Sequence, residues 1–167
     1  MNNNDITSKD QVLKLLEAGV DPRSCNMVEF DGHLYLHNLL DKKTQNSLPT
    51  EELIQKILCE FPSADIQAQK NFMERHNICP LWTSAKLMNL IPDRQEQDIS
   101  LTRGGYDPLT PPADDEKYNS DVFFCLYKYN NEAKNLRIEK TFGGDSYIEA
   151  VIKMVVTWMT SFKPMIE

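Results

Sequence analysis

Four side chains of the sequence could bind a metal ion or act in nucleophilic catalysis: His33, His37, His76 and Cys79. Residues 33 and 37 share one face of an extended segment, so the two histidines form a ligand-like pair. A zinc site needs further ligands, which the H-x-x-C spacing of His76 and Cys79 could supply. The same spacing is the local candidate for a thiolate beside a histidine. A metal- or thiol-dependent enzyme is therefore one hypothesis for this chain.

Structural roles explain the same four residues more simply. Histidine is common on half-exposed strand faces, and a cysteine directly before proline is more often packed than reactive. No protease signature surrounds Cys79, and none of the four cysteines belongs to a CxxC pair. We therefore predict reduced, mostly buried cysteines, no catalytic or metal-binding residue and no cofactor, with the enzyme as the alternative.

The pair Gly143-Gly144 lies just before a predicted helix, where backbone N–H groups could hold a phosphate. The segment lacks the GxGxxG and GK[ST] patterns, and Asp145 places a negative charge where the phosphate would sit. The pair instead predicts a tight strand-to-helix turn in which glycine supplies a positive φ.

A long connection with three prolines runs from residue 104 to residue 119 (GGYDPLTPPADDEKYN). Connections of this length without structure of their own are uncommon and often functional, and the acid spacing fits no EF-hand loop. We therefore predict a solvated insert whose tip is a candidate partner-binding loop. Its candidate contact residues are Tyr106, Asp107, Asp114, Asp115 and Glu116.

Composition and charge exclude several classes of function. The 167 residues are 41% hydrophobic, enough for one ordinary domain or two very small ones. The net charge of -7 argues against binding nucleic acid or anionic lipid. No apolar run approaches 18 residues, and the polar N-terminus does not resemble a signal peptide. We therefore expect a cytoplasmic protein without nucleic-acid or membrane partners.

The elements that must position these residues begin with a helix and a hairpin. Ser8 and Gln11 have the spacing of a capping box, which predicts a helix start, and Gly19 ends the helix. Asp31-Gly32 between extended runs predicts a hairpin over residues 25–39.

A second helix is predicted to begin near Pro49 and to stop at Pro62. The segment 63–80 has weak periodicity, and Phe72 and Met73 indicate a short helix or a packed connector. We place the boundary between two subdomains there, 1–80 and 81–167, with one single domain as the alternative.

The second half predicts a helix, three strands and a helix. Thr83 caps a short helix, and strands follow over residues 97–103, 121–129 and 134–142. The middle strand is apolar on both faces, which is typical of a central strand covered on each side. The final helix begins at Ser146, in a second capping box. The predicted class is α+β: an antiparallel β-meander packed by helices, preceded by a helix, hairpin and helix layer.

Three segments resemble known proteins in their order along the chain. They are Leu16–Asp21 (LEAGVD), Leu81–Pro92 (LWTSAKLMNLIP) and Ala150–Trp158 (AVIKMVVTW). With them the chain resembles a widespread group of small uncharacterised proteins encoded by prophages and other mobile elements of intestinal bacteria. The acidic 104–119 insert departs from that group. The resemblance implies a phage or mobile-element setting and assigns no functional residue.

The expected function is that of a non-enzymatic protein-binding module in such a setting. The expected partner is another protein, and self-association is an alternative because the last predicted helix has a wide apolar stripe. A minor structural or assembly component of a phage is a further alternative, and it predicts a fixed oligomer in solution.

Overall fold

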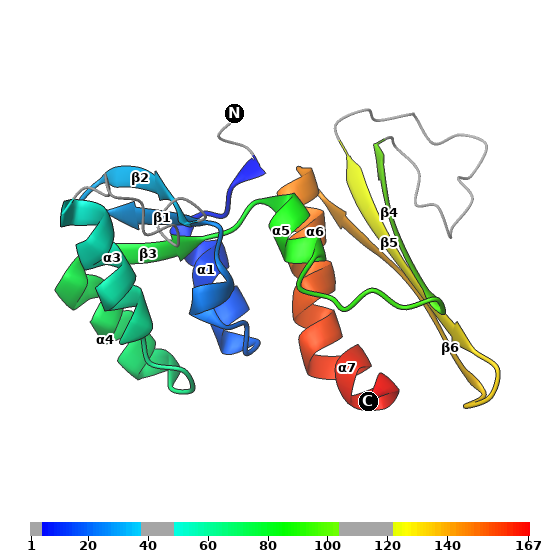
Figure 1. The fold of residues 1–167 in the computed structure, drawn as a ribbon. Coiled ribbons are helices and arrows are strands. Elements are labelled where there is room, and N and C mark those ends of the chain that lie inside the picture. The colour runs from blue at the N-terminus through cyan, green and yellow to red at the C-terminus, as the bar shows by residue number, and fades with distance from the viewer. Residues whose placement is uncertain (1–4, 38–48, 104–121) are drawn as a thin grey trace. The chain divides into compact units, whose positions relative to one another are not determined.

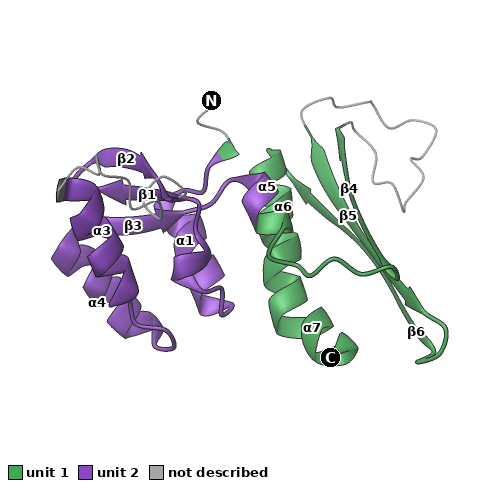
Figure 2. Ribbon diagram, viewed as in Figure 1, with its two compact units in different colours: residues 1–5, 87–167 green, residues 6–86 purple. Residues whose placement is uncertain are grey.

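The computed structural model describes residues 5–37, 49–103 and 122–167. They form two compact units, one of residues Ile6–Lys86 and one of residues Met1–Asp5 and Leu87–Glu167 (Figure 2). Each unit contains a three-stranded antiparallel sheet and helices, so the predicted α+β class is confirmed.

In the N-terminal unit the strand order is β2-β1-β3. In the view of Figure 1 its three longer helices lie below this sheet. Its elements are α1 (Lys9–Glu17), a 3₁₀ turn (Pro22–Ser24), β1 (Met27–Phe30), β2 (His33–Leu36), α3 (Pro49–Cys59), α4 (Ile66–His76) and β3 (Ile78–Leu81). α1 and α4 pack against β3 and against each other.

The start and end of α1 are as predicted. The Ser8 hydroxyl accepts a hydrogen bond from the Gln11 N–H, and the Gln11 side chain accepts one from the Ser8 N–H at 2.8 Å. Gly19 follows the helix with a φ of 93°, a conformation that other residues adopt only at a cost in free energy. The buried face of α1 is made of Val12, Leu15 and Leu16.

The predicted hairpin is confirmed for the residues described. Asp31 and Gly32 have φ values of 48° and 80°, and Phe30 pairs with His33 across this two-residue turn. Two successive positive φ values define the type I′ turn, which matches the twist of a hairpin. The turn therefore fixes the register that pairs Glu29 with Leu34.

The segment 63–80 differs from its prediction as a connector. It contains the 11-residue helix α4, whose N-cap Asp65 accepts a hydrogen bond from the Gln67 N–H, and the strand β3. β3 pairs with β1 over four residues, so this segment lies inside the N-terminal unit. The two units meet in sequence between Lys86 and Leu87, within the short helix α5 (Ser84–Met88).

The C-terminal unit is the predicted meander, with strand order β4-β5-β6 (Figure 1). Its elements are β4 (Gln97–Arg103), β5 (Phe123–Asn131), β6 (Leu136–Gly144), α6 (Tyr147–Thr157), a π-helical segment (Trp158–Phe162) and α7 (Lys163–Ile166). α6 packs on β5 and β6. The Phe162 ring stacks on Tyr127 of the central strand, with centroids 5.1 Å apart.

β5 is central as predicted, but its coverage differs from the expectation. Tyr127 and Tyr129 are buried on the face that carries the stacked Phe162. On the opposite face Leu126 is buried, whereas Lys128 and Asn130 are exposed. The second half of the strand is therefore covered on one face.

The pair Gly143-Gly144 leaves room for the neighbouring helix α6, and the prediction that these glycines have a positive φ is wrong. Both glycines end β6, and the described glycines with positive φ are Gly19 and Gly32. A Cβ atom on Gly144 would lie 2.9 Å from Cβ of Glu149 and 3.0 Å from the backbone nitrogen of Ala150. Glycine at this position therefore lets α6 begin directly against the end of β6.

Candidate binding site

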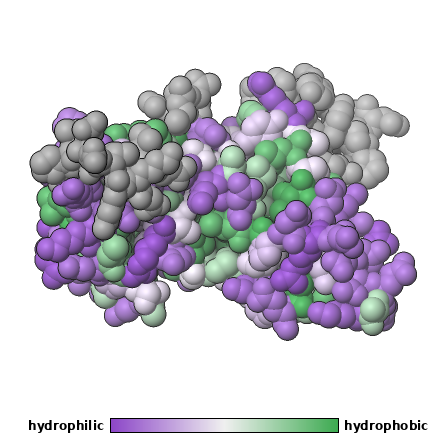
Figure 3. Space-filling view, viewed as in Figure 1, coloured by the Kyte–Doolittle hydropathy of each residue, from purple (hydrophilic) through white to green (hydrophobic). Residues whose placement is uncertain are grey.

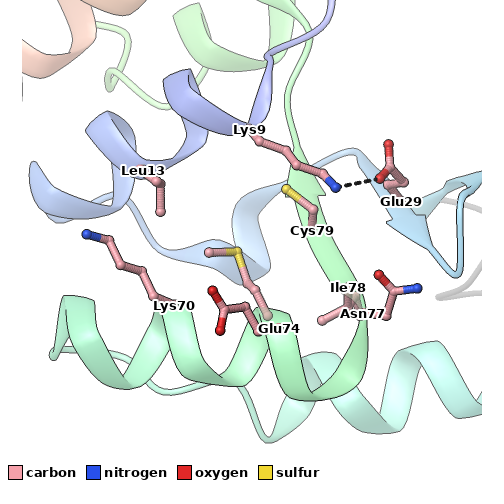
Figure 4. Close-up of a pocket in the computed structure, with 9 residues that line it drawn as sticks. Lys9, Leu13, Glu29, Lys70, Glu74, Asn77, Ile78 and Cys79 are labelled. Carbon is pink, nitrogen blue, oxygen red and sulfur yellow. Dashed lines mark ion pairs between the residues drawn. The ribbon is translucent and has the colours of Figure 1, made fainter.

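A pocket of about 280 Å³ lies between α1 and α4 of the N-terminal unit (Figure 4). One end is closed by β1 and by the turn that leads into β3. The pocket is lined by Lys9, Leu13, Glu29, Lys70, Met73, Glu74, Asn77, Ile78 and Cys79. The lining combines charged and apolar side chains.

Helical spacing brings the lining residues of each helix onto one face. Lys9 and Leu13 are four residues apart on α1, and Lys70, Met73 and Glu74 have i, i+3 and i+4 spacing on α4. Side chains at these spacings lie above one another along a helix. Two facing stripes therefore form the long walls of the pocket.

The end of the pocket is fixed by a turn at Asn77. This residue caps α4 in the left-handed conformation, with φ 48° and ψ 47°. Its side-chain amide donates to Oδ1 of Asp31 at 2.9 Å, and its carbonyl oxygen accepts from the Asp31 N–H at 3.1 Å. Both hydrogen bonds join the end of α4 to the tip of the hairpin, which places β3 beside β1.

Two of the charged side chains that line the pocket form an ion pair with each other. Nζ of Lys9 lies 3.3 Å from Oε1 of Glu29. Lys70 and Glu74 are four residues apart on α4, yet neither takes part in an ion pair with a described residue. Figure 4 shows both side chains extending from α4 into the space below α1. The pocket thus offers one free ammonium group and one free carboxylate.

The apolar part of the lining includes Cys79, one of the four candidate residues of the enzyme hypothesis. Burial raises the pKa of its thiol to about 11, so the thiol is protonated at neutral pH. Its weak hydrogen bond goes to the Pro80 carbonyl oxygen at 3.7 Å. The His76 ring packs on Phe72, with centroids 4.4 Å apart. Cys79 therefore contributes apolar surface and lacks the chemistry of an activated nucleophile.

The two histidines of the hairpin have separate environments. His33 is exposed at the start of β2, whereas Nδ1 of His37 donates to the Cys25 carbonyl oxygen at 2.7 Å. In residues 5–37, 49–103 and 122–167, no three His, Cys, Asp or Glu side chains are arranged to hold a metal ion. The four residues of the enzyme hypothesis therefore do not converge on one site.

The outer edge of β2 is a second candidate binding feature. Leu34 and Leu36 are 51% and 43% exposed on one face of this strand. The His37 N–H donates to the Asn26 carbonyl oxygen, so in the antiparallel alternation residues 33, 35 and 37 bond toward β1. The N–H and C=O groups of Leu34 and Leu36 therefore point away from the sheet, and no described strand pairs with them.

The two features are connected by the register of the sheet. Glu29 pairs with Leu34 on one side and with Cys79 on the other. Directly paired residues share a face, so the exposed leucines and the end wall of the pocket lie on the same face of the sheet.

Sequence reasoning missed most of the pocket because six of its nine lining residues lie in the segment 63–80, which had weak periodicity. The spacing of Lys70, Met73 and Glu74 is a helical signal that could have indicated a common face. The predicted loop residues, from Tyr106 to Glu116, lie outside the described residues.

No protein-family model matches the sequence, and no curated protein or solved structure is significantly similar to it. Within the described part of the chain, no helix has the length and apolar character needed to cross a bilayer. Hydrophilic side chains predominate on the face drawn in Figure 3, with smaller hydrophobic areas between them.

Proposed function

We propose that this chain is a non-enzymatic protein-binding module of the cytoplasm, in the accessory repertoire of a phage or other mobile element. The observation that carries the proposal is the outer edge of β2, where Leu34 and Leu36 are exposed beside backbone groups with which no described strand pairs. A partner segment in extended conformation would add a strand to this edge and bury both leucines.

Strand addition suits this edge for physical reasons. Backbone hydrogen bonds supply affinity that is independent of sequence, and side-chain contacts on alternate residues supply specificity. Exposed edges are usually protected by charge, proline or a bulge, because an unprotected edge pairs readily with other chains. The four residues of β2, His-Leu-Tyr-Leu, include no Lys, Asp, Glu or Pro.

The setting and the exclusion of catalysis have separate support. The phage or mobile-element setting rests on the resemblance of the three segments 16–21, 81–92 and 150–158. The protonated thiol of Cys79 and the separation of the histidines favour binding over thiol or metal chemistry. The net charge of -7 favours a protein partner over nucleic acid.

The proposal is tested by affinity capture of the tagged chain from host cells during prophage induction, with crosslinking and mass spectrometry. Leu34→Lys and Leu36→Lys place a charge on the edge, and Leu53→Lys on α3, where leucine is 48% exposed, is the matched control. We expect one phage or host protein with the wild type and the control, and a loss of at least about tenfold with the β2 variants.

Equal capture by all four chains, or no protein above background, would contradict strand addition at β2. A fixed oligomer of the chain that captures nothing else would support the structural or assembly role instead.

A further inference from the structure

The pocket between α1 and α4 is distinct from the β2 edge, and its chemistry indicates a ligand of its own. Its volume of about 280 Å³ equals about nine water molecules at about 30 Å³ each. This is slightly below the range of about 300–1,000 Å³ that is typical of pockets for drug-sized ligands. The occupant is therefore a molecule of roughly nine to twelve non-hydrogen atoms.

The free charges of the pocket have opposite signs. Lys9 and Glu29 neutralise each other at 3.3 Å, whereas Lys70 and Glu74 have no ion-pair partner in the described part of the chain. These two residues stand four apart on α4, with the lysine before the glutamate, which is the less favourable order for a direct ion pair along a helix. Lys70 is half-buried and Glu74 is exposed at the mouth of the pocket. A ligand with one carboxylate and one ammonium group would satisfy both.

Apolar side chains complete the lining. Leu13 extends from α1 into the pocket in Figure 4, and Ile78 is buried at the start of β3. Met73 and the protonated Cys79 also contribute to the lining, and methionine adapts readily to the shape of an apolar group. This surface provides a place for an apolar side chain of the ligand.

We propose that this pocket binds a free apolar α-amino acid, with its carboxylate at Lys70, its ammonium group at Glu74 and its side chain against Leu13 and Ile78. Leucine and methionine have the size that the volume indicates. The proposal goes beyond the protein-binding function and does not depend on it, because none of these four residues belongs to β2.

The direct experiment follows backbone amide NMR shifts of the ¹⁵N-labelled full chain during titration with L-leucine. We expect saturable shifts at α1, α4 and β3 with a Kd of roughly 0.1–1 mM, as for a small ligand in a half-open site. Isoamylamine lacks the carboxylate, 4-methylpentanoate lacks the ammonium group, and glycine lacks the side chain. Each should bind at least about fivefold more weakly than leucine.

Variants assign the two charges. Lys70→Met should bind leucine and isoamylamine with equal affinity, because the variant has no ammonium group for the leucine carboxylate. Glu74→Gln should bind leucine and 4-methylpentanoate with equal affinity, because it has no carboxylate for the leucine ammonium group. Lys56→Met, at an exposed lysine of α3, is the matched control and should bind leucine as the wild type does. Leu36→Lys should also leave leucine binding unchanged, because Leu36 pairs with Met27, which does not line the pocket, and this separates the test from that of the β2 edge.

No saturable shift up to about ten times the expected Kd would overturn the proposal. Equal affinity of the wild type for leucine and the two analogues would overturn it as well, because the free charges would then take no part. Unchanged leucine binding by both Lys70→Met and Glu74→Gln would also overturn the proposal.

Discussion

Three of the four cysteine side chains are buried deeply enough to change their acid–base behaviour. Burial raises the pKa of Cys25 to about 12, of Cys79 to about 11 and of Cys125 to about 12. Cys59 is exposed, so three of the four cysteines agree with the prediction of mostly buried, reduced cysteines. The buried thiols therefore stay protonated in the folded chain well above neutral pH.

These pKa values predict a loss of stability in alkaline solution. Above about pH 9 a thiol ionises in the unfolded chain but stays protonated in the folded one, so unfolding releases a proton. Each buried thiol should therefore lower the free energy of unfolding by about 1.4 kcal/mol per pH unit between pH 9 and 11. Urea unfolding of Cys25→Ala and wild type at several pH values measures the difference in slope.

Val28→Ala is the control for this measurement. Val28 is fully buried in the same unit and has no titratable group, so its truncation lowers stability at every pH and keeps the wild-type slope. A Cys25→Ala slope equal to that of the wild type would show that the buried thiol does not contribute.

At the scale of elements, the junction of β6 and α6 depends on the absence of a side chain at Gly144. Gly144→Ala should lower the free energy of unfolding by about 1–3 kcal/mol, because its Cβ would press on Cβ of Glu149 and on the Ala150 nitrogen. Gly143→Ala should cost less, since its nearest neighbour is the Phe124 ring at 3.2 Å, and that side chain can rotate. Urea unfolding of both variants checks the order.

The two glycine variants form a matched pair, since they are adjacent and neither glycine has a positive φ. A Gly144→Ala variant as stable as Gly143→Ala would contradict the close approach of α6 to β6.

Elements with strong local signals were predictable from the sequence. The capping box at Ser8, the turn Asp31-Gly32 and the strand Gln97–Arg103 were all located correctly, because each is encoded by residues close together in sequence. The α+β class followed from these elements.

α4 and β3 were not predictable by the same reasoning. Within α4 the buried side chains are Gln69 and Phe72, so the helix has little apolar periodicity. β3 contains Pro80, which usually argues against a strand. The proline is tolerated because β3 is an edge strand and because Val28 and Pro80 form a pair that exchanges no hydrogen bonds. Long-range pairing decides both outcomes, and the pocket depends on them.

The last helix contains a π-helical turn that ordinary α-helical periodicity does not predict. Its buried stripe continues through Trp158, Phe162 and Ile166, which are four residues apart. The Lys163 N–H donates to the Trp158 carbonyl oxygen, which is the wider i to i+5 turn of a π-helix. This wider turn keeps the three side chains on one face of the helix.

At the scale of the whole molecule, the chain consists of two units with separate sheets, and both candidate sites belong to the N-terminal unit. The C-terminal unit secures its own C-terminus through polar contacts. Nζ of Lys134 donates to the Ile166 carbonyl oxygen at 2.9 Å, and Arg94 pairs with Glu167 at 3.0 Å. The proposed partner binding is therefore a prediction for the N-terminal unit.

The central claim, that β2 binds a protein partner by its outer edge, is tested most directly by a photo-crosslinking amino acid in place of Leu36. The same amino acid in place of Leu53 is the reference, because both leucines have similar exposure. After irradiation in host cells, we expect one discrete covalent adduct from position 36 and none from position 53. The same set of adducts from both positions, or no adduct from position 36, would contradict the claim.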